Sequence, residues 1–134
     1  MKINNFLTAS AMLANLLVAA PAFAADVYVI TNSAVTLSAD DVRDVFLGEK
    51  QIANGTKLVP MDNASLQPAF LEKVVKADAA KYGTIWTKKG FRDGLNPPTV
   101  KSGDAEVITA VKSTPGAVGY VSSVPAGVKM VQKY

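Results

Sequence analysis

The strongest constraint on the fold is the alternation of short apolar runs with helical patterns along residues 25–134. The run at residues 27–30 is β-branched and aromatic, as strands buried in a sheet are, and further short strands are expected at residues 58–61, 117–121 and 128–131. Helical spacing of apolar residues follows Ser38 and Ser65, covers residues 77–88, and continues from Ser102 to Pro115. Strands separated by helices predict an α/β fold, a single compact domain around a largely buried sheet.

Local signals set the expected limits of these elements. Ser38 has the character of an N-cap, with Asp41 at the capping-box position and Gly48 as the stop of the helix. The pair Asn54-Gly55 predicts a tight turn. Glycines and prolines between residues 90 and 98 predict a connecting loop without regular structure.

Residues 1–24 have the three-part pattern of a secretory signal peptide. Lys2 precedes an apolar stretch from residue 6 to residue 20, and the segment closes on Ala22-Phe23-Ala24. The apolar stretch is shorter than the roughly 20 residues that a membrane-spanning helix needs. We therefore expect cleavage after Ala24, a periplasmic location, no membrane span after cleavage, and one domain over residues 25–134.

The composition excludes most catalytic and metal chemistry. The sequence contains no Cys and no His, which rules out disulfides, Cys or His metal sites, and nucleophiles activated by an imidazole. Asp40 and Asp41 form the only tight acidic pair, and helix capping and solvation explain them better than a metal does. We predict a non-enzymatic protein with no catalytic residue, no cofactor and no metal.

Net charge argues against nucleic acid as a partner. The chain carries +3, and removal of residues 1–24 takes away only Lys2, which leaves +2. Lys88, Lys89 and Arg92 do lie among aromatic residues, a mixture that also occurs in single-strand binding sites. A basic helix end with aromatics packed beneath it is the simpler interpretation, and an acidic protein or an anionic ligand is preferred to nucleic acid.

Three segments resemble the small periplasmic proteins related to phosphate-type solute-binding proteins of ABC transporters. They are the Leu-Ser start and Phe-Leu-Gly end of residues 37–48, the segment Leu-Val-Pro-Met-Asp-Asn-Ala-Ser of residues 58–65, and Ser-Thr-Pro-Gly-Ala-Val-Gly-Tyr-Val of residues 113–121. With residues 82–86 and the Asn-Pro-Pro of residues 96–98, the resemblance covers nearly all of residues 25–134. It implies one lobe of the type II periplasmic binding protein fold.

The resemblance also implies an anion site that this sequence has altered. The family takes its phosphate ligands from a Ser-Gly-Thr segment at a helix N-terminus, preceded by an Arg. Ser65 matches the Ser, but Leu66 and Gln67 replace the Gly and Thr, and Asn63 or Asp62 stands where the Arg would be. We therefore expect phosphate to bind weakly or not at all. The alternative role for Ser65 is that of a plain helix N-cap.

Six polar residues are the candidate ligand-binding residues. Thr31, Asn32 and Ser33 follow the first predicted strand, and Asp62, Asn63 and Ser65 follow the second. Ligands of open α/β sheets bind beyond the carboxyl ends of strands, so the two groups are expected to line one shallow crevice. Two functions remain open: capture of an oxyanion such as phosphate for an ABC transporter, or an accessory or sensory module that contacts an envelope protein.

Overall fold

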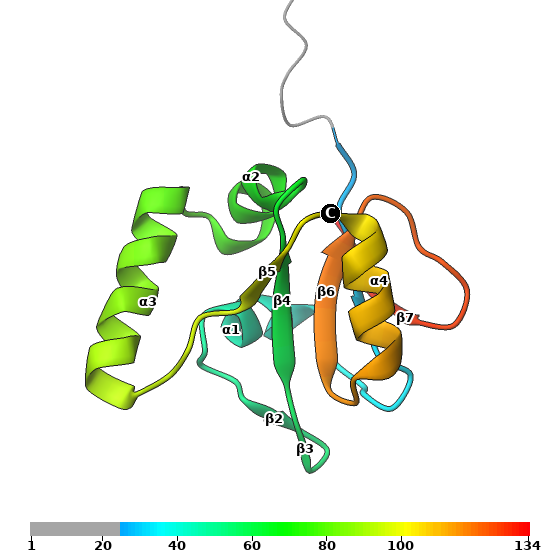
Figure 1. Ribbon diagram of the computed structural model, residues 1–134, viewed down its shortest axis with the longest axis horizontal. Helices are drawn as coiled ribbons and strands as arrows, with labels where there is room; N and C mark the ends of the chain where they lie inside the picture. Colours follow the sequence, from blue (N-terminus) through cyan, green and yellow to red (C-terminus); the bar gives the residue numbers. More distant parts are fainter. Residues whose placement is uncertain (1–24) are drawn as a thin grey trace, which may run out of the picture.

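A five-stranded sheet forms the centre of the computed structural model, which describes residues 25–134 (Figure 1). The strands lie in the order β5-β4-β6-β1-β7. Their bounds are Tyr28–Thr31 (β1), Val59–Asn63 (β4), Thr99–Lys101 (β5), Ala117–Val121 (β6) and Lys129–Lys133 (β7). A separate hairpin of Ile52–Ala53 (β2) and Thr56–Lys57 (β3) turns at Asn54 and Gly55, as predicted.

The sheet is mixed, and its strand directions decide which residues share an end of it. β4 runs parallel to both β5 and β6, with Val59 beside Ala117 and Asp62 beside Val100. β1 runs antiparallel to β6 and to β7, so that Thr31 lies beside Val118 at the beginning of β6. The carboxyl ends of β1 and β4 therefore lie at opposite ends of the sheet.

Helices cover both faces of this sheet. Figure 1 shows α4 in front of β6 and α1 behind the sheet. The face of α1 also carries α2, which continues directly into the π-helical segment η2, and α3. The bounds are Ala39–Asp41 (η1), Val42–Phe46 (α1), Gln67–Phe70 (α2), Leu71–Val75 (η2), Ala79–Asp93 (α3) and Asp104–Ser113 (α4). The predicted α/β class is confirmed.

An aromatic cluster anchors the larger of the two cores. The rings of Phe46, Phe70 and Tyr120 are fully buried. Phe70 stacks on Tyr120 with centroids 3.9 Å apart, and Phe46 meets Phe70 edge-on at 4.7 Å. Because the three rings come from α1, α2 and β6, they join the helical layer to the middle of the sheet.

The smaller core lies under α4, where a glycine permits close packing. A Cβ at Gly119 of β6 would lie 2.6 Å from the Cγ1 atom of Val107 on α4. Val107 and Val111 are both completely buried against this strand. The glycine within an otherwise apolar strand therefore marks the place where a helix approaches the backbone.

The contact between α3 and the rest of the domain is made by a few side chains. Tyr82, Trp86 and Lys89 are its buried residues. The Trp86 indole Nε1 donates to the carbonyl of Phe46 at 3.1 Å, and Lys89 Nζ lies 3.3 Å from a carboxylate oxygen of Glu49. Figure 1 shows α3 standing apart from the sheet on the side of β5.

Several local predictions need correction. Gly90 lies inside α3, which begins with a side-chain cap from Asp78 and ends at Gly94 in the left-handed conformation. Ser38 donates to the Asp41 carboxylate instead of capping a backbone N–H group. The strand β5 was not predicted. None of the helices in residues 25–134 has the length and apolar character needed to cross a membrane, and the predicted signal peptide lies outside the described residues.

Candidate functional site

Asn63 organises the polar end of β4. It is completely buried, and its Nδ2 donates to Asp104 Oδ1 at 2.8 Å and to the carbonyl of Tyr120 at 2.9 Å. Its Oδ1 accepts from the N–H group of Ser65 at 3.1 Å and from the Ser65 hydroxyl at 2.7 Å. Asp104 in turn accepts from the backbone and side chain of Ser122. Each of these polar groups finds its partner within the chain.

The backbone donors between β4 and α2 are also occupied. The N–H group of Ala64 donates to the carbonyl of Lys101 at 2.8 Å, and that of Leu66 donates to the carbonyl of Asn63 at 3.0 Å. Pro68 has no N–H group to offer. Ser65 is not the N-cap of α2, because Leu66 takes that position and the Ser65 hydroxyl is bound to Asn63. The N-cap role expected for Ser65 is therefore wrong.

Asp62 holds two tyrosines from distant parts of the chain. Its side chain is 1% exposed, and it accepts from the Tyr120 hydroxyl at 2.7 Å and from the Tyr82 hydroxyl at 2.9 Å. Desolvation raises the pKa of Asp62 above its ordinary value, although hydrogen bonds from Tyr120, Tyr82 and Gln67 oppose the shift. Burial, together with the Asp62 charge, raises the pKa of both tyrosines, which stay protonated as donors.

The structure places Thr31, Asn32 and Ser33 away from this site. Since β1 is antiparallel to β6 whereas β4 is parallel to it, these residues lie at the other end of the sheet from Asp62. Asn32 Nδ2 donates to the carbonyls of Val111 and Lys112, at the C-terminal end of α4. Thr31 is buried and its hydroxyl lies 3.5 Å from a backbone carbonyl. The expectation that both groups line one crevice is therefore wrong.

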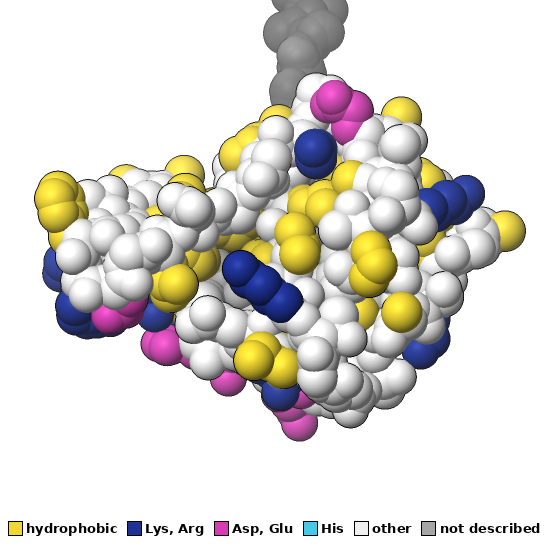
Figure 2. Space-filling model, turned by 60° about the horizontal axis from the view of Figure 1, so that its bottom comes forward, with side chains coloured by type: hydrophobic (Ala, Val, Ile, Leu, Met, Phe, Trp, Pro, Cys, Tyr) yellow, Lys and Arg dark blue, Asp and Glu magenta, His cyan; other side chains and the backbone are white. Residues whose placement is uncertain are grey.

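A groove of about 570 Å³ runs between α3 and the edge of the sheet. Figure 2 shows the surface hollowed between α3, at left, and the body of the molecule, with hydrophobic side chains along the hollow. Asp62 and Tyr82 are part of its lining, together with Val100 of β5 and the loop of residues 95–98. We call this space the α3–β5 groove.

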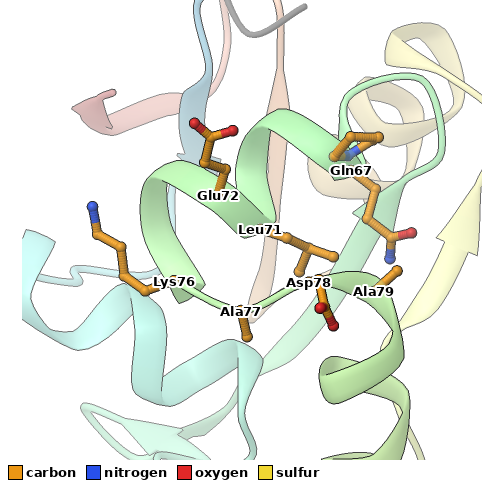
Figure 3. Close-up of a pocket in the computed structure, with 8 residues that line it drawn as sticks. Gln67, Leu71, Glu72, Lys76, Ala77, Asp78 and Ala79 are labelled. Carbon is orange, nitrogen blue, oxygen red and sulfur yellow. The ribbon is translucent and has the colours of Figure 1, made fainter.

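A second hollow of about 550 Å³ lies where η2 leads into α3 (Figure 3). Leu71, Ala77 and Asp78 line the central part of this hollow (Figure 3). Gln67 lines both this hollow and the α3–β5 groove. Within residues 25–134, no cluster of three or more acidic, His or Cys side chains could hold a metal ion. The chemistry available in the α3–β5 groove is therefore hydrogen bonding, apolar contact and the carboxyl group of Asp62. The second hollow offers Glu72, Lys76 and Asp78 as charged side chains.

Sequence reasoning pointed to Asp62, Asn63 and Ser65 but missed the role of α3. Tyr82 and Trp86 are four residues apart, which puts them on one face of a helix, and this spacing is the signal that could have found them. In the basic and aromatic mixture of α3, Tyr82 and Trp86 are packed beneath, as expected, whereas Phe91 is 89% exposed. Lys89 is buried and pairs with Glu49.

Comparison with solved structures identifies the fold. The crystal structure of an ABC-type phosphate transport receptor from Vibrio cholerae is similar, with a TM-score of 0.50 and 18% identity over 81% of this chain and 46% of that chain. PstS from Borrelia burgdorferi matches with a TM-score of 0.48 and 14% identity over 72% of this chain and 41% of that one. The chain thus spans less than half the length of these receptors.

The similarity to the Vibrio cholerae receptor confirms the fold that the sequence resemblance implied. At this identity it establishes architecture and leaves the binding residues to be argued from the chain itself. No family model and no curated protein sequence matches the chain.

Proposed function

We propose that the chain is an exported, non-enzymatic binding protein, built like one lobe of a phosphate-type receptor, that does not retain the receptor's phosphate site. The receptor-like fold supports a binding role, since the similar Vibrio cholerae structure is a transport receptor. The lack of Cys and His and the absence of a metal cluster among the described residues are consistent with a protein that has no catalytic role.

One observation carries the proposal: the backbone donors between β4 and α2 are already used. An anion bound at a helix start needs N–H groups and hydroxyls that point at it. Here the N–H groups of Ala64, Ser65 and Leu66 and the hydroxyl of Ser65 all donate within the chain. The nearby Asp62 carboxylate would also repel a dianion when ionised.

The size of the effect follows from the number of lost contacts. A charge-assisted hydrogen bond contributes about 1.5–3 kcal/mol, and every 1.4 kcal/mol corresponds to about a tenfold change in affinity. Replacement of the Gly, Thr and Arg of the resemblance by Leu66, Gln67 and Asn63 removes two or three such contacts. We therefore expect a dissociation constant for phosphate in the millimolar range or weaker.

Calorimetric titration of the purified protein with inorganic phosphate tests this expectation. We expect no saturable heat at micromolar concentrations, and the same result for the Ser65→Ala variant. Micromolar binding that is abolished by Ser65→Ala would contradict the proposal and restore phosphate capture for an ABC transporter. Micromolar binding that survives Ser65→Ala would contradict it as well and would place the phosphate elsewhere on the chain.

Export is a separate part of the proposal and rests on the residue pattern of the first 24 positions. Mass spectrometry of the periplasmic fraction should find a mature N-terminus at Ala25. Recovery of the protein in the membrane with Met1 intact would contradict both cleavage and the periplasmic location.

A second candidate function is contact with an envelope protein, such as a transporter component, a sensor or a surface protein. Phe91 and Val100 favour it, since both line the α3–β5 groove and remain 89% and 58% exposed. A photo-crosslinking residue placed at Phe91 in living cells should then give one discrete adduct. The same residue at Ile52, which is 61% exposed on the β2–β3 hairpin, is the matched control and should give none.

A further inference from the structure

The first observation concerns the charge at the base of the α3–β5 groove. Among residues 25–134, Asp62 and the Tyr82 phenol are the only acidic or basic groups that line it, and Asp62 is 1% exposed. None of the ion pairs within the described residues includes Asp62. A buried carboxylate without a cation is costly for a folded chain.

The second observation concerns the side of α3 that faces the groove. Gly83 lies in the interior of α3, where glycine is less stable than alanine by about 0.8–1 kcal/mol. Its φ angle is not positive, and a Cβ placed on it would meet nothing within 4 Å. Neither backbone conformation nor packing requires a glycine at this position, and its effect is to leave the groove open.

The third observation concerns the walls. Apolar side chains from three elements line the groove: Phe91 on α3, Val100 on β5, and Leu95 in the connecting loop. Val100 is beside Asp62 in the parallel β4–β5 register, so both side chains lie on the same face of the sheet. A ligand that contacts the carboxylate therefore also lies against apolar surface.

We propose that the α3–β5 groove binds a small organic cation, in which an ammonium group is carried on an apolar body. A carboxylate offers about four acceptor positions; the hydroxyls of Tyr82 and Tyr120 use two of them, and the Gln67 side chain uses a third. The tyrosines fix the carboxylate while its remaining position accepts from the ammonium group, and the apolar body packs on the walls. This inference rests on the proposed role as a binding protein and names the class of ligand.

Basic side chains near the groove do not oppose this assignment. Lys50 and Lys57 line a separate hollow of about 330 Å³, which shares Trp86 and the loop of residues 95–98 with the groove but not Asp62. Lys89 lies on α3 but is paired with Glu49. None of these three lysines lines the α3–β5 groove beside Asp62.

Trp86 provides the measurement, because it is the only tryptophan of the sequence and lines the groove. Its emission is followed while the purified protein is titrated with 2-phenylethylammonium, with the neutral 2-phenylethanol of nearly the same shape, or with the anionic phenylacetate. We expect saturable binding of the ammonium compound, and binding about ten- to a hundredfold weaker for the alcohol. Equal affinity for the two, no saturable binding, or tighter binding of phenylacetate would overturn the inference.

Two variants locate the site. Asp62→Asn should remove the preference for the ammonium compound over the alcohol, and Gly83→Leu should abolish binding by filling the groove while the helix remains folded. Thr84→Leu, an exposed position of α3 outside the groove lining, is the matched control and should bind as the parent protein does. Unchanged affinity in Gly83→Leu would overturn the inference. Phosphate titration tests the proposed function separately, so the two can fail independently.

Discussion

Replacement of Phe46 by alanine tests the way the helical layer is joined to the sheet. A buried phenylalanine removes about 150–250 Å² from water, which corresponds to about 4–6 kcal/mol at 25 cal/mol per Å². Alanine keeps part of this contribution, and measured losses for such changes are about 3–5 kcal/mol. Phe46 is fully buried and contacts Phe70 and Tyr120 edge-on, so we expect a loss in that range.

Urea unfolding followed by Trp86 fluorescence measures this loss. The indole donates to the backbone carbonyl of Phe46, a bond that alanine at position 46 can keep, so the probe reports on the same region in both proteins. Phe91→Ala is the matched control: the ring is 89% exposed, and its removal should change the free energy of unfolding by no more than about 0.5 kcal/mol. A loss below about 1 kcal/mol for Phe46→Ala would refute the assignment of this ring as a core anchor.

Three further predictions concern Asp62, Asp104 and Gly119. Because burial raises the pKa of Asp62, its contribution to the free energy of unfolding is full below the ordinary carboxyl pKa and declines as the pH rises through the folded-state pKa. Urea unfolding between pH 4 and pH 8 measures this decline, since the chain has no histidine that titrates in this range. The Asp62→Asn variant should lack the decline. A steeper pH dependence in Asp62→Asn than in the parent protein would contradict the argument for Asp62. Asp104→Asn should show the opposite sign and lose stability at neutral pH. The reason is that hydrogen bonds from Ser122 and Asn63 together outweigh desolvation and lower the pKa of Asp104. Gly119→Ala should lower the free energy of unfolding by about 1–3 kcal/mol, because the added methyl group clashes with Val107. Gly83→Ala is the control: it has open space around it and should stabilise the protein by up to about 1 kcal/mol. Equal effects of the two variants would refute the close packing of α4 on β6.

The sequence predicted those elements whose signals are local. The short apolar runs became β1, β4, β6 and β7, and the tight turn expected at Asn54-Gly55 joins β2 to β3. β5 escaped prediction because it has three residues, follows two prolines, and is exposed at Val100. α3 runs through Gly90 because its two ends are well stabilised, by the Asp78 cap at the start and the left-handed Gly94 at the end. This stabilisation exceeds the cost of Gly90 in the helix interior.

The candidate site was predicted less well, because it depends on contacts between distant residues. Nothing in the sequence around Thr31 reveals that β1 runs antiparallel to β6, and strand direction alone moved Thr31–Ser33 to the far end of the sheet. The spacing of polar residues after β4 did identify Asp62 and Asn63. It did not show that their partners would be Tyr82, Tyr120 and Asp104, between 20 and 58 residues away in the chain.

The two polar residues that end β4 serve different faces of the sheet. Successive residues of a strand point to opposite faces, so Asp62 and Asn63 serve different layers. Asn63 is bonded to Asp104 of α4, and the N–H group and hydroxyl of Ser65 both donate to Asn63. Asp62 faces α3 and places a buried carboxyl group at the base of an apolar groove. Consequently a ligand of this lobe is selected by a carboxylate and apolar walls, which favours a cation where a phosphate receptor favours an anion.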